Sequence, residues 1–439
     1  MFSRPAALFF CVLVVLTGAG AFLLAQPWAT LTDPRDWQFF WARHYWQSTF
    51  DSISAVVGCG LMTHPAERAY TDAGRSVLVA LSLAGAIAYI STILAALRDR
   101  LPLLNLRAAP HPALLAIVFV LVTLFTSQAA CLLLAIVAAP LSHLDATQSL
   151  STGVLSFGWL PQRPAGALAW LIAVLGLLTA AGWTLWIMPF AAWRRRCLQS
   201  AAATGVTFGS WILFLILAAA LLAAFESPRG GRESGAVPDS LAARHSGERL
   251  SRCALQVFSA AGAGVQTEAL SERSASDGTK VVLAAVMLVG GFPGSPLGGL
   301  GWPLAAALLI GAFAGRTRDE RAFAIAVRLA VTLLALVLLT ALGLLVIEHF
   351  TATAYQPPPT FADAFLDASS AVAGGGLTSG VSAAVTSRNL SSGIQQRVDV
   401  YQYGMAWLML AMLLGRIAPV WIIAASPVDQ SRDPSEPRP

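Results

Sequence analysis

The chain has 439 residues, of which 56% are hydrophobic and only 12% are charged, and its formal net charge is +5 at pH 7. Soluble domains carry about 25% charged residues, so this composition excludes an ordinary soluble protein and indicates a membrane protein. The positive charge does not indicate nucleic-acid binding, because the arginines gather at the ends of hydrophobic segments, where they orient a membrane protein.

Eight hydrophobic stretches are long enough to cross a bilayer. A spanning helix needs about 20 mostly apolar residues, and helices are expected because lipid offers no partners for backbone polar groups. The stretches lie at about 5–26, 74–97, 111–140, 165–193, 203–225, 279–315, 320–349 and 400–425. The first resembles a signal peptide but has no convincing cleavage site, so we interpret it as a retained helix. The sequence therefore predicts an all-α polytopic membrane protein.

The arginine clusters predict the orientation of these helices. If eight helices alternate, the clusters fall on one side of the membrane, and the opposite short connections are poorer in Arg and Lys. The clusters are Arg4, the trio Arg98, Arg100 and Arg107, the run Arg194, Arg195 and Arg196, and the trio Arg316, Arg318 and Arg321. Positively charged connections stay in the cytoplasm. We therefore expect both termini in the cytoplasm and a multi-pass protein of the inner (cytoplasmic) membrane.

Four glycine-rich turns recur along the chain, each after a short amphipathic segment. The turns are Val57–Gly60, Leu155–Gly158, Ala261–Gly264 and Ala373–Gly376, and the amphipathic segments lie at about 36–55, 145–154, 249–260 and 360–372. These segments are too short to span and too apolar for simple loops, so we expect re-entrant pore helices, which are tolerated only where they line a water-filled cavity. The chain then divides into four repeats of helix, pore loop and helix: 1–108, 109–200, 201–318 with a broken second helix, and 319–439 with the C-terminal tail.

The turns are suited to binding a cation through the backbone. Carbonyl oxygens can replace the hydration shell of an ion, and glycine allows the unusual φ angles that such a turn requires. Three turns contain Gly-x-Gly, whereas the second has Ser156 in the first position. The candidate ion-binding residues are Gly60, Gly158, Gly264 and Gly376, with Cys59, Phe157, Ala263 and Gly375 before them. The alternative is that these glycines only cap helices or allow close packing. No ring of carboxylates appears near the turns.

A second glycine-rich segment, Met287–Gly301, interrupts the sixth hydrophobic stretch. Proline and glycine at this density prevent a continuous helix. We expect a helix, a break and a second helix, with the break acting as a gate across the inner pore; the alternative is a static kink. The candidate gating residues are Gly290, Gly291, Pro293, Gly294, Ser295, Gly298 and Gly299.

Arg416 lies within the last hydrophobic stretch. An arginine at the centre of a span costs about 2.5–3.5 kcal/mol on insertion scales, so it usually has a function or a partner. In a pore it would repel cations and contribute to gating. The alternative is that its head group extends to the cytoplasmic interface.

Together these residues resemble the Trk/Ktr/HKT superfamily of potassium transporters. The segment Asp367–Gly380 resembles the family pattern Ser-Ala-x-x-Thr-x-Gly-Leu, Gly290–Gly299 resembles the intramembrane gating loop, and Gly415 with Arg416 resembles a Gly-Arg pair in the permeation path. The resemblance implies four helix–pore-loop–helix repeats around a central pore, in an eight-helix Ktr-like layout. It also implies channel-like K⁺ uptake through a filter made by Gly60, Gly158, Gly264 and Gly376.

The chain departs from the family where threonines usually flank the filter glycine. Cys59 and Phe157 stand in the first two turns, and Ala261 and Gly262 stand where Arg-Thr is common. The resemblance implies that glycine at all four filter positions favours K⁺ over Na⁺. Two alternatives remain open: a sodium-permeable or non-conducting member that acts as a subunit or sensor, and a secondary transporter of another solute. Four repeats in one direction argue against the latter, whose folds usually contain inverted repeats.

The resemblance also implies partners. Family members form homodimers surrounded by membrane lipid, and many bacterial members bind a cytoplasmic nucleotide-binding regulatory subunit. The chain itself has no P-loop and no nucleotide fingerprint, so we expect neither an enzyme nor a bound cofactor. Its five cysteines lack metal-ligand spacing and are expected to be free thiols, with a Cys59–Cys253 disulfide as the alternative.

Overall fold

The structure is a computed structural model that describes residues 4–31, 37–62, 69–98, 117–118, 121–122, 167–181, 198–227, 246–263, 270, 275–292, 298–314, 320–351, 359–379 and 398–426. Within them the regular structure is helical, apart from a single antiparallel bridge between Thr30 and Tyr70. The helices are α1 (Arg4–Leu24), α2 (Trp37–Val57), α4 (Asp72–Arg98), α7 (Ala167–Ala180), α9 (Leu198–Phe225), α10 (Ser246–Phe258), the π-helical turn η5 (Ser259–Ala263), α11 (Asp277–Val289), α12 (Trp302–Ala314), α13 (Glu320–Thr351), α14 (Phe361–Ala373) and α16 (Val398–Ala425).

The protein is a polytopic all-α membrane protein. In the part of the chain that is described, five helices are long and apolar enough to cross a membrane: Ala6–Leu24, Asp72–Ala96, Gly205–Phe225, Phe323–His349 and Gly404–Ala425. They correspond to five of the predicted stretches, while α7 covers part of the fourth and α11 with α12 covers the sixth. Nearly all of the third stretch lies outside the described residues.

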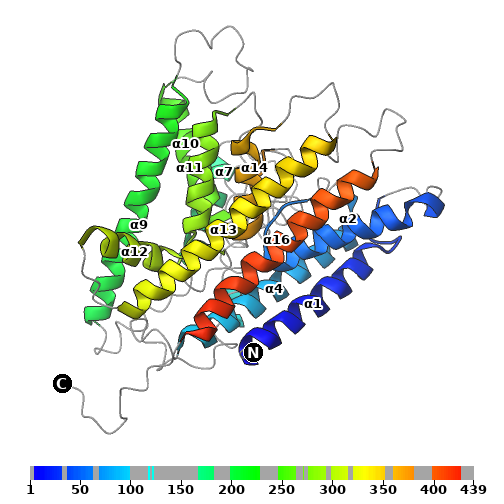
Figure 1. The fold of residues 1–439 in the computed structure, drawn as a ribbon, viewed down its shortest axis with the longest axis horizontal. Coiled ribbons are helices and arrows are strands. Elements are labelled where there is room, and N and C mark those ends of the chain that lie inside the picture. The colour runs from blue at the N-terminus through cyan, green and yellow to red at the C-terminus, as the bar shows by residue number, and fades with distance from the viewer. Residues whose placement is uncertain are drawn as a thin grey trace.

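Three of the four segments predicted to be pore helices are helical. They are α2, α10 and α14, in the first, third and fourth amphipathic segments. Helices α10 and α14 are short, with 13 residues each, whereas α2 has 21 residues and is as long as α1, so the expected shortness is wrong for the first segment. The second segment, at 145–154, lies outside the described residues. Figure 1 shows α1, α2, α4, α16 and α13 running side by side, with α9, α10 and α11 grouped beyond α14.

The first and last parts of the chain pack in the same way. Helices α1, α2 and α4 contact one another, and so do α13, α14 and α16, with the helix that precedes the glycine turn in the middle position of each set along the chain. Gly85 of α4 lies against the carbonyl oxygen of Val56, and Gly415 of α16 lies against that of Val372. Both valines stand four residues before the last glycine of their turn, so the two contacts occupy equivalent places.

Helix α14 is shared by two apolar cores. Ala368 and Val372 pack in a core with α1, α2, α4, α13 and α16. Leu366 and Ala373 pack in a second core with α7, α9, α10 and α11. Since α14 contributes to both, its position sets how the two groups of helices meet.

Three cysteines fall in the described residues, namely Cys11, Cys59 and Cys253, and none of the three forms a disulfide. The expectation of free thiols is confirmed for these three, and the alternative Cys59–Cys253 disulfide is wrong.

Gly415→Ala should destabilise the fold, because its new methyl group would overlap the carbonyl oxygen of Val372. Overpacking of this kind costs about 1–3 kcal/mol. Gly404→Ala on the same helix is the matched control, because its Cβ would meet nothing within 4 Å. Thermal unfolding in detergent measures both, and equal stability of the two variants would contradict the tight contact.

Candidate functional site

The first and fourth glycine turns have the same backbone conformation. Each has two glycines in the left-handed region, with φ of 65° and 77° at Gly58 and Gly60 and of 72° and 70° at Gly374 and Gly376. Residues with a side chain rarely adopt such angles. Glycine is therefore required at both positions of each turn.

Each turn is attached to the helix that precedes it by an equivalent hydrogen bond. The Cys59 amide donates to the carbonyl of Ser54 over 2.8 Å, and the Gly375 amide donates to the carbonyl of Ser370 over 3.0 Å. Gly374 is also the C-cap of α14, so the helix-cap alternative is correct for that glycine. A cap does not explain Gly376, which repeats the left-handed φ two residues further on.

The structure brings these two turns together. The Cys59 thiol donates a hydrogen bond to the carbonyl of Ser370 on α14 over 3.3 Å. A Cβ on Gly374 would lie 3.3 Å from the carbonyl oxygen of Gly58. Cys59 and the apolar residues Leu61 and Leu377 are buried. Two turns that are more than 300 residues apart in the sequence therefore form one buried unit.

The other two turns are described only in part. Gly262 of the third turn lies against the backbone of Gly176 on α7, and Ala263 ends η5. Gly264, Phe157 and Gly158 lie outside the described residues, so their place relative to the first and fourth turns stays a prediction.

The sixth hydrophobic stretch is broken rather than kinked. Helix α11 ends at Val289, where Gly290 caps it with φ of 67°, and α12 begins at Trp302. The chain returns beside the end of α11, because the amide of Leu300 donates to the carbonyl of Leu288 over 2.8 Å. Of the candidate gating residues, Gly290, Gly291, Gly298 and Gly299 are described, and Pro293, Gly294 and Ser295 lie outside the described residues.

This connection contacts the fourth glycine turn. The Gly298 amide donates to the carbonyl of Ala373, the last residue of α14, over 2.9 Å. The side chain of Met287 on α11 fills the space beside Gly375, where a Cβ would overlap its sulfur. The broken helix therefore touches the turn through both its helical end and its returning segment.

Arg416 lies at the same junction. It is only 2% exposed, and its Nη1 and Nη2 make no hydrogen bond to any residue that the structure describes. Its guanidinium stacks 4.6 Å from the ring centre of Tyr89, a favourable cation–π contact. A Cβ on Gly374 would lie 2.6 Å from Nη2, and one on Gly298 would lie 3.3 Å from Nη1. Arg416 thus stands between the fourth turn and the broken helix, and it does not extend to an interface.

Two buried carboxylates stand behind the turns, and sequence reasoning missed them. Asp51 and Asp367 each precede the last glycine of their turn by nine residues, and both side chains are buried. Asp51 accepts a hydrogen bond from the Tyr70 hydroxyl over 2.8 Å, and Asp367 accepts one from the Ser379 amide over 2.7 Å. The equal spacing was the signal that could have revealed them.

In these two contacts both carboxylates accept hydrogen bonds, one from the Tyr70 hydroxyl and the other from the Ser379 amide. Burial, with a further contribution from Asp51, raises the pKa of Tyr70 well above its ordinary value, so the hydroxyl keeps its proton and donates. Each carboxylate ties its pore helix to the chain that follows the turn. We infer that this link restrains the turn from both sides.

No protein-family model matches this chain, and no curated protein matches it either. Among solved structures, the chain is similar to the potassium transporter TrkH from Vibrio parahaemolyticus. The TM-score is 0.57 at 16% identity, and the alignment covers 94% of this chain and 82% of that chain. The chain has the TrkH fold. The resemblance to the Trk/Ktr/HKT superfamily is therefore confirmed at the level of the fold.

The likeness to TrkH extends over most of the chain. The alignment covers 94% of this chain, so it includes most of the described helices. At 16% identity the likeness concerns the fold alone. The contacts among Gly298, Gly374 and Arg416 belong to this chain's own structure.

Asp367→Leu should lower the free energy of unfolding by about 1–3 kcal/mol, because it leaves the buried Ser379 amide without its acceptor. Asp367→Asn keeps an acceptor oxygen and should cost less. Asp72→Asn is the control, because that side chain is 70% exposed and pairs only with its neighbour on α4. Denaturation in detergent compares the three variants, and an effect of Asp367→Leu no larger than that of Asp72→Asn would contradict the link.

Proposed function

We propose that the protein transports potassium ions across the cytoplasmic membrane through a pore lined by the four glycine turns. The observation that carries this proposal is the buried junction of the first and fourth turns, which share their left-handed glycines and contact each other. The TrkH fold supports it, because TrkH is a potassium transporter. The proposed role is transport, not catalysis.

The proposed filter uses backbone carbonyls as ion ligands. Gly60 and Gly376, with Cys59 and Gly375 before them, would contribute from the first and fourth turns. Gly158 and Gly264 would complete the ring from the second and third repeats. Carbonyl dipoles can replace water around a cation without any fixed charge. The C-terminal ends of α2 and α14 lead into the turns and add their negative dipole ends.

The proposed gate is the segment Gly290–Gly301 together with Arg416. The hydrogen bond from Gly298 to Ala373 holds the segment against the fourth turn. Two nitrogens of the Arg416 guanidinium make no hydrogen bond to a described residue, and water in a pore would provide such partners. A buried positive charge beside the path raises the energy of a passing cation. Opening would then require the segment to move away from Ala373.

The setting of this transporter is also part of the proposal. We expect four repeats, eight spans, both termini in the cytoplasm, a homodimer, and a cytoplasmic nucleotide-binding regulatory subunit. A second candidate function is a sodium-permeable or non-conducting subunit or sensor. It is favoured by Cys59, whose thiol is engaged with Ser370 in the place of a threonine hydroxyl.

Purified protein in lipid vesicles should carry K⁺ down its gradient, with less Na⁺ flux under opposing K⁺ and Na⁺ gradients. Gly376→Val should reduce K⁺ flux by about tenfold or more, because valine resists the left-handed φ and each 1.4 kcal/mol of barrier changes a rate tenfold. Gly209→Ala on α9 is the control, since nothing lies within 4 Å of its Cβ. K⁺ flux that survives Gly376→Val would rule out this pore, and equal Na⁺ flux would favour the second candidate.

Arg416→Gln should raise K⁺ flux in the same vesicles, because it removes a buried positive charge beside the proposed path. Arg416→Lys keeps the charge and should stay near the wild-type rate. A rate constant for ⁸⁶Rb⁺ uptake compares the variants at matched protein density. Equal or slower uptake by folded Arg416→Gln would contradict the proposed barrier.

A further inference from the structure

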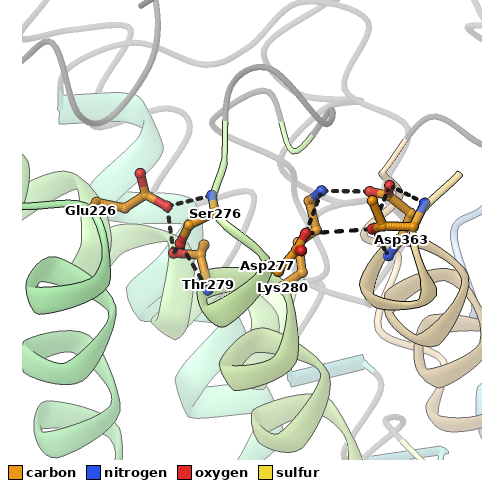
Figure 2. A network of polar contacts seen from close by, with 7 residues as sticks. Glu226, Ser276, Asp277, Thr279, Lys280 and Asp363 are labelled. Carbon is orange, nitrogen blue, oxygen red and sulfur yellow. Dashed lines mark hydrogen bonds and ion pairs between the residues drawn. The ribbon is translucent and has the colours of Figure 1, made fainter. Parts of the chain in front are cut away.

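A buried ion pair joins α11 to the start of α14. Lys280 is fully buried, and its Nζ lies 2.6 Å from Oδ1 of Asp363 and 3.6 Å from Oδ1 of Asp277. The Asp363 side chain is only 3% exposed. Figure 2 shows the lysine reaching from one helix to the carboxylate of the other. A charge in such surroundings needs its partner, because a buried ion left alone is strongly destabilising.

Asp363 also organises the N-terminus of α14. Its Oδ2 accepts hydrogen bonds from the amide and hydroxyl of Thr360, over 3.1 and 2.9 Å, while Thr360 Oγ1 accepts one from the Asp363 amide. This is a capping box, which satisfies donors that the first helical turn leaves free. One oxygen of Asp363 therefore caps its own helix, and the other pairs with Lys280.

The N-terminus of α11 is held just as firmly on its other side. Ser276 caps α11 by accepting from the amide of Thr279. Glu226, at the end of α9 and 3% exposed, accepts from the Ser276 amide over 2.8 Å and from the Thr279 hydroxyl over 2.6 Å. Lys280 thus projects from a helix end that is itself fixed to α9, so it is a firm support for α14.

The opposite end of α14 is tied to the same helix. There Met287 of α11 packs beside Gly375, and Gly298, beyond the end of α11, donates to the carbonyl of Ala373. A helix of 13 residues is about 20 Å long, so a shift at its start is transmitted to the turn at its end. Contacts at both ends define where α14 lies along α11.

We propose that the Lys280–Asp363 pair positions the fourth glycine turn by holding α14 in register with α11. An apolar pair of the same shape would fill the space as well, but it would not select one register. The pair therefore acts as a positioning device that couples the turn to the helix carrying the broken segment. The consequence for ion flux rests on the proposed function, whereas the position of α14 does not.

Cys59 provides a direct test, because its buried thiol donates to the carbonyl of Ser370 near the C-terminal end of α14. A full-length variant that keeps only this cysteine is made by replacing Cys11, Cys131, Cys197 and Cys253 with alanine. Its rate of reaction with a small maleimide is measured in detergent. In that background Lys280→Met/Asp363→Asn removes the pair while keeping an acceptor for Thr360. Lys280→Met alone would leave a buried carboxylate unpaired, so the double variant decides if the single one fails to fold.

If the pair positions α14, the double variant should label Cys59 about tenfold faster or more, since the Cys59–Ser370 contact opens. A second background that keeps only the buried Cys253 of α10 separates local from general loosening, and its labelling should not change. Arg252→Met is the control, because it removes an ion pair with Glu248 whose side chains are 35% and 46% exposed. Unchanged Cys59 labelling in the folded double variant, or equal acceleration at Cys253, would overturn the proposal.

Ion flux is measured on the same variants in vesicles. The double variant should lose discrimination between K⁺ and Na⁺ by about fivefold or more, while Arg252→Met keeps it. If wild-type protein carries no K⁺ at all, the proposed function fails, and the labelling result still decides the position of α14. If Cys59 becomes reactive while discrimination stays at the wild-type value, the coupling of α14 to the filter is wrong.

Discussion

The position of α14 is the constraint on which the rest of the structure depends. Apart from the aromatic residues Phe361 and Phe365, all of its side chains are buried, and they contribute to both apolar cores. Its start is paired with Lys280 and its end accepts a hydrogen bond from Gly298. The first turn, the last helix and the broken helix all contact α14, so a change in the register of α14 would alter its contacts with each of them.

Glycine allows these elements to approach so closely. Gly85 and Gly415 bring their helices onto carbonyl oxygens near the ends of α2 and α14, where any side chain would overlap the backbone. In a membrane the hydrophobic effect does not drive helices together, and small residues permit the van der Waals contact that does. In the turns glycine is needed for a different reason, because residues with a side chain rarely adopt the left-handed φ found there. Close packing and unusual backbone angles thus account for glycine in different places.

Local sequence patterns were sufficient to predict many of the helices and the break between α11 and α12. The lengths of the apolar stretches predicted five spans that the structure bears out, and proline and glycine predicted the break that separates α11 from α12. Helices α10 and α14 follow from amphipathic segments too short to span, whereas α2, with 21 residues, is longer than predicted. The charged and polar contacts were not predictable in the same way. Lys280 and Asp363 stand 83 residues apart, and no local pattern pairs them. Asp51 and Asp367 were visible only as an equal spacing whose meaning depended on the turns being equivalent.

The sequence by itself determined the membrane setting, the positions of most helices and the glycine turns, because hydrophobicity and backbone freedom are properties of short segments. Only the tertiary structure decided which turns meet and that Arg416 lies beside the fourth turn. It also decided that a buried lysine, Lys280, forms an ion pair with Asp363 of α14. The physical reason is that these contacts join segments far apart in the chain. Each depends on the register of one helix against another, and that register is set by the sum of all packing contacts rather than by any residue's own preference.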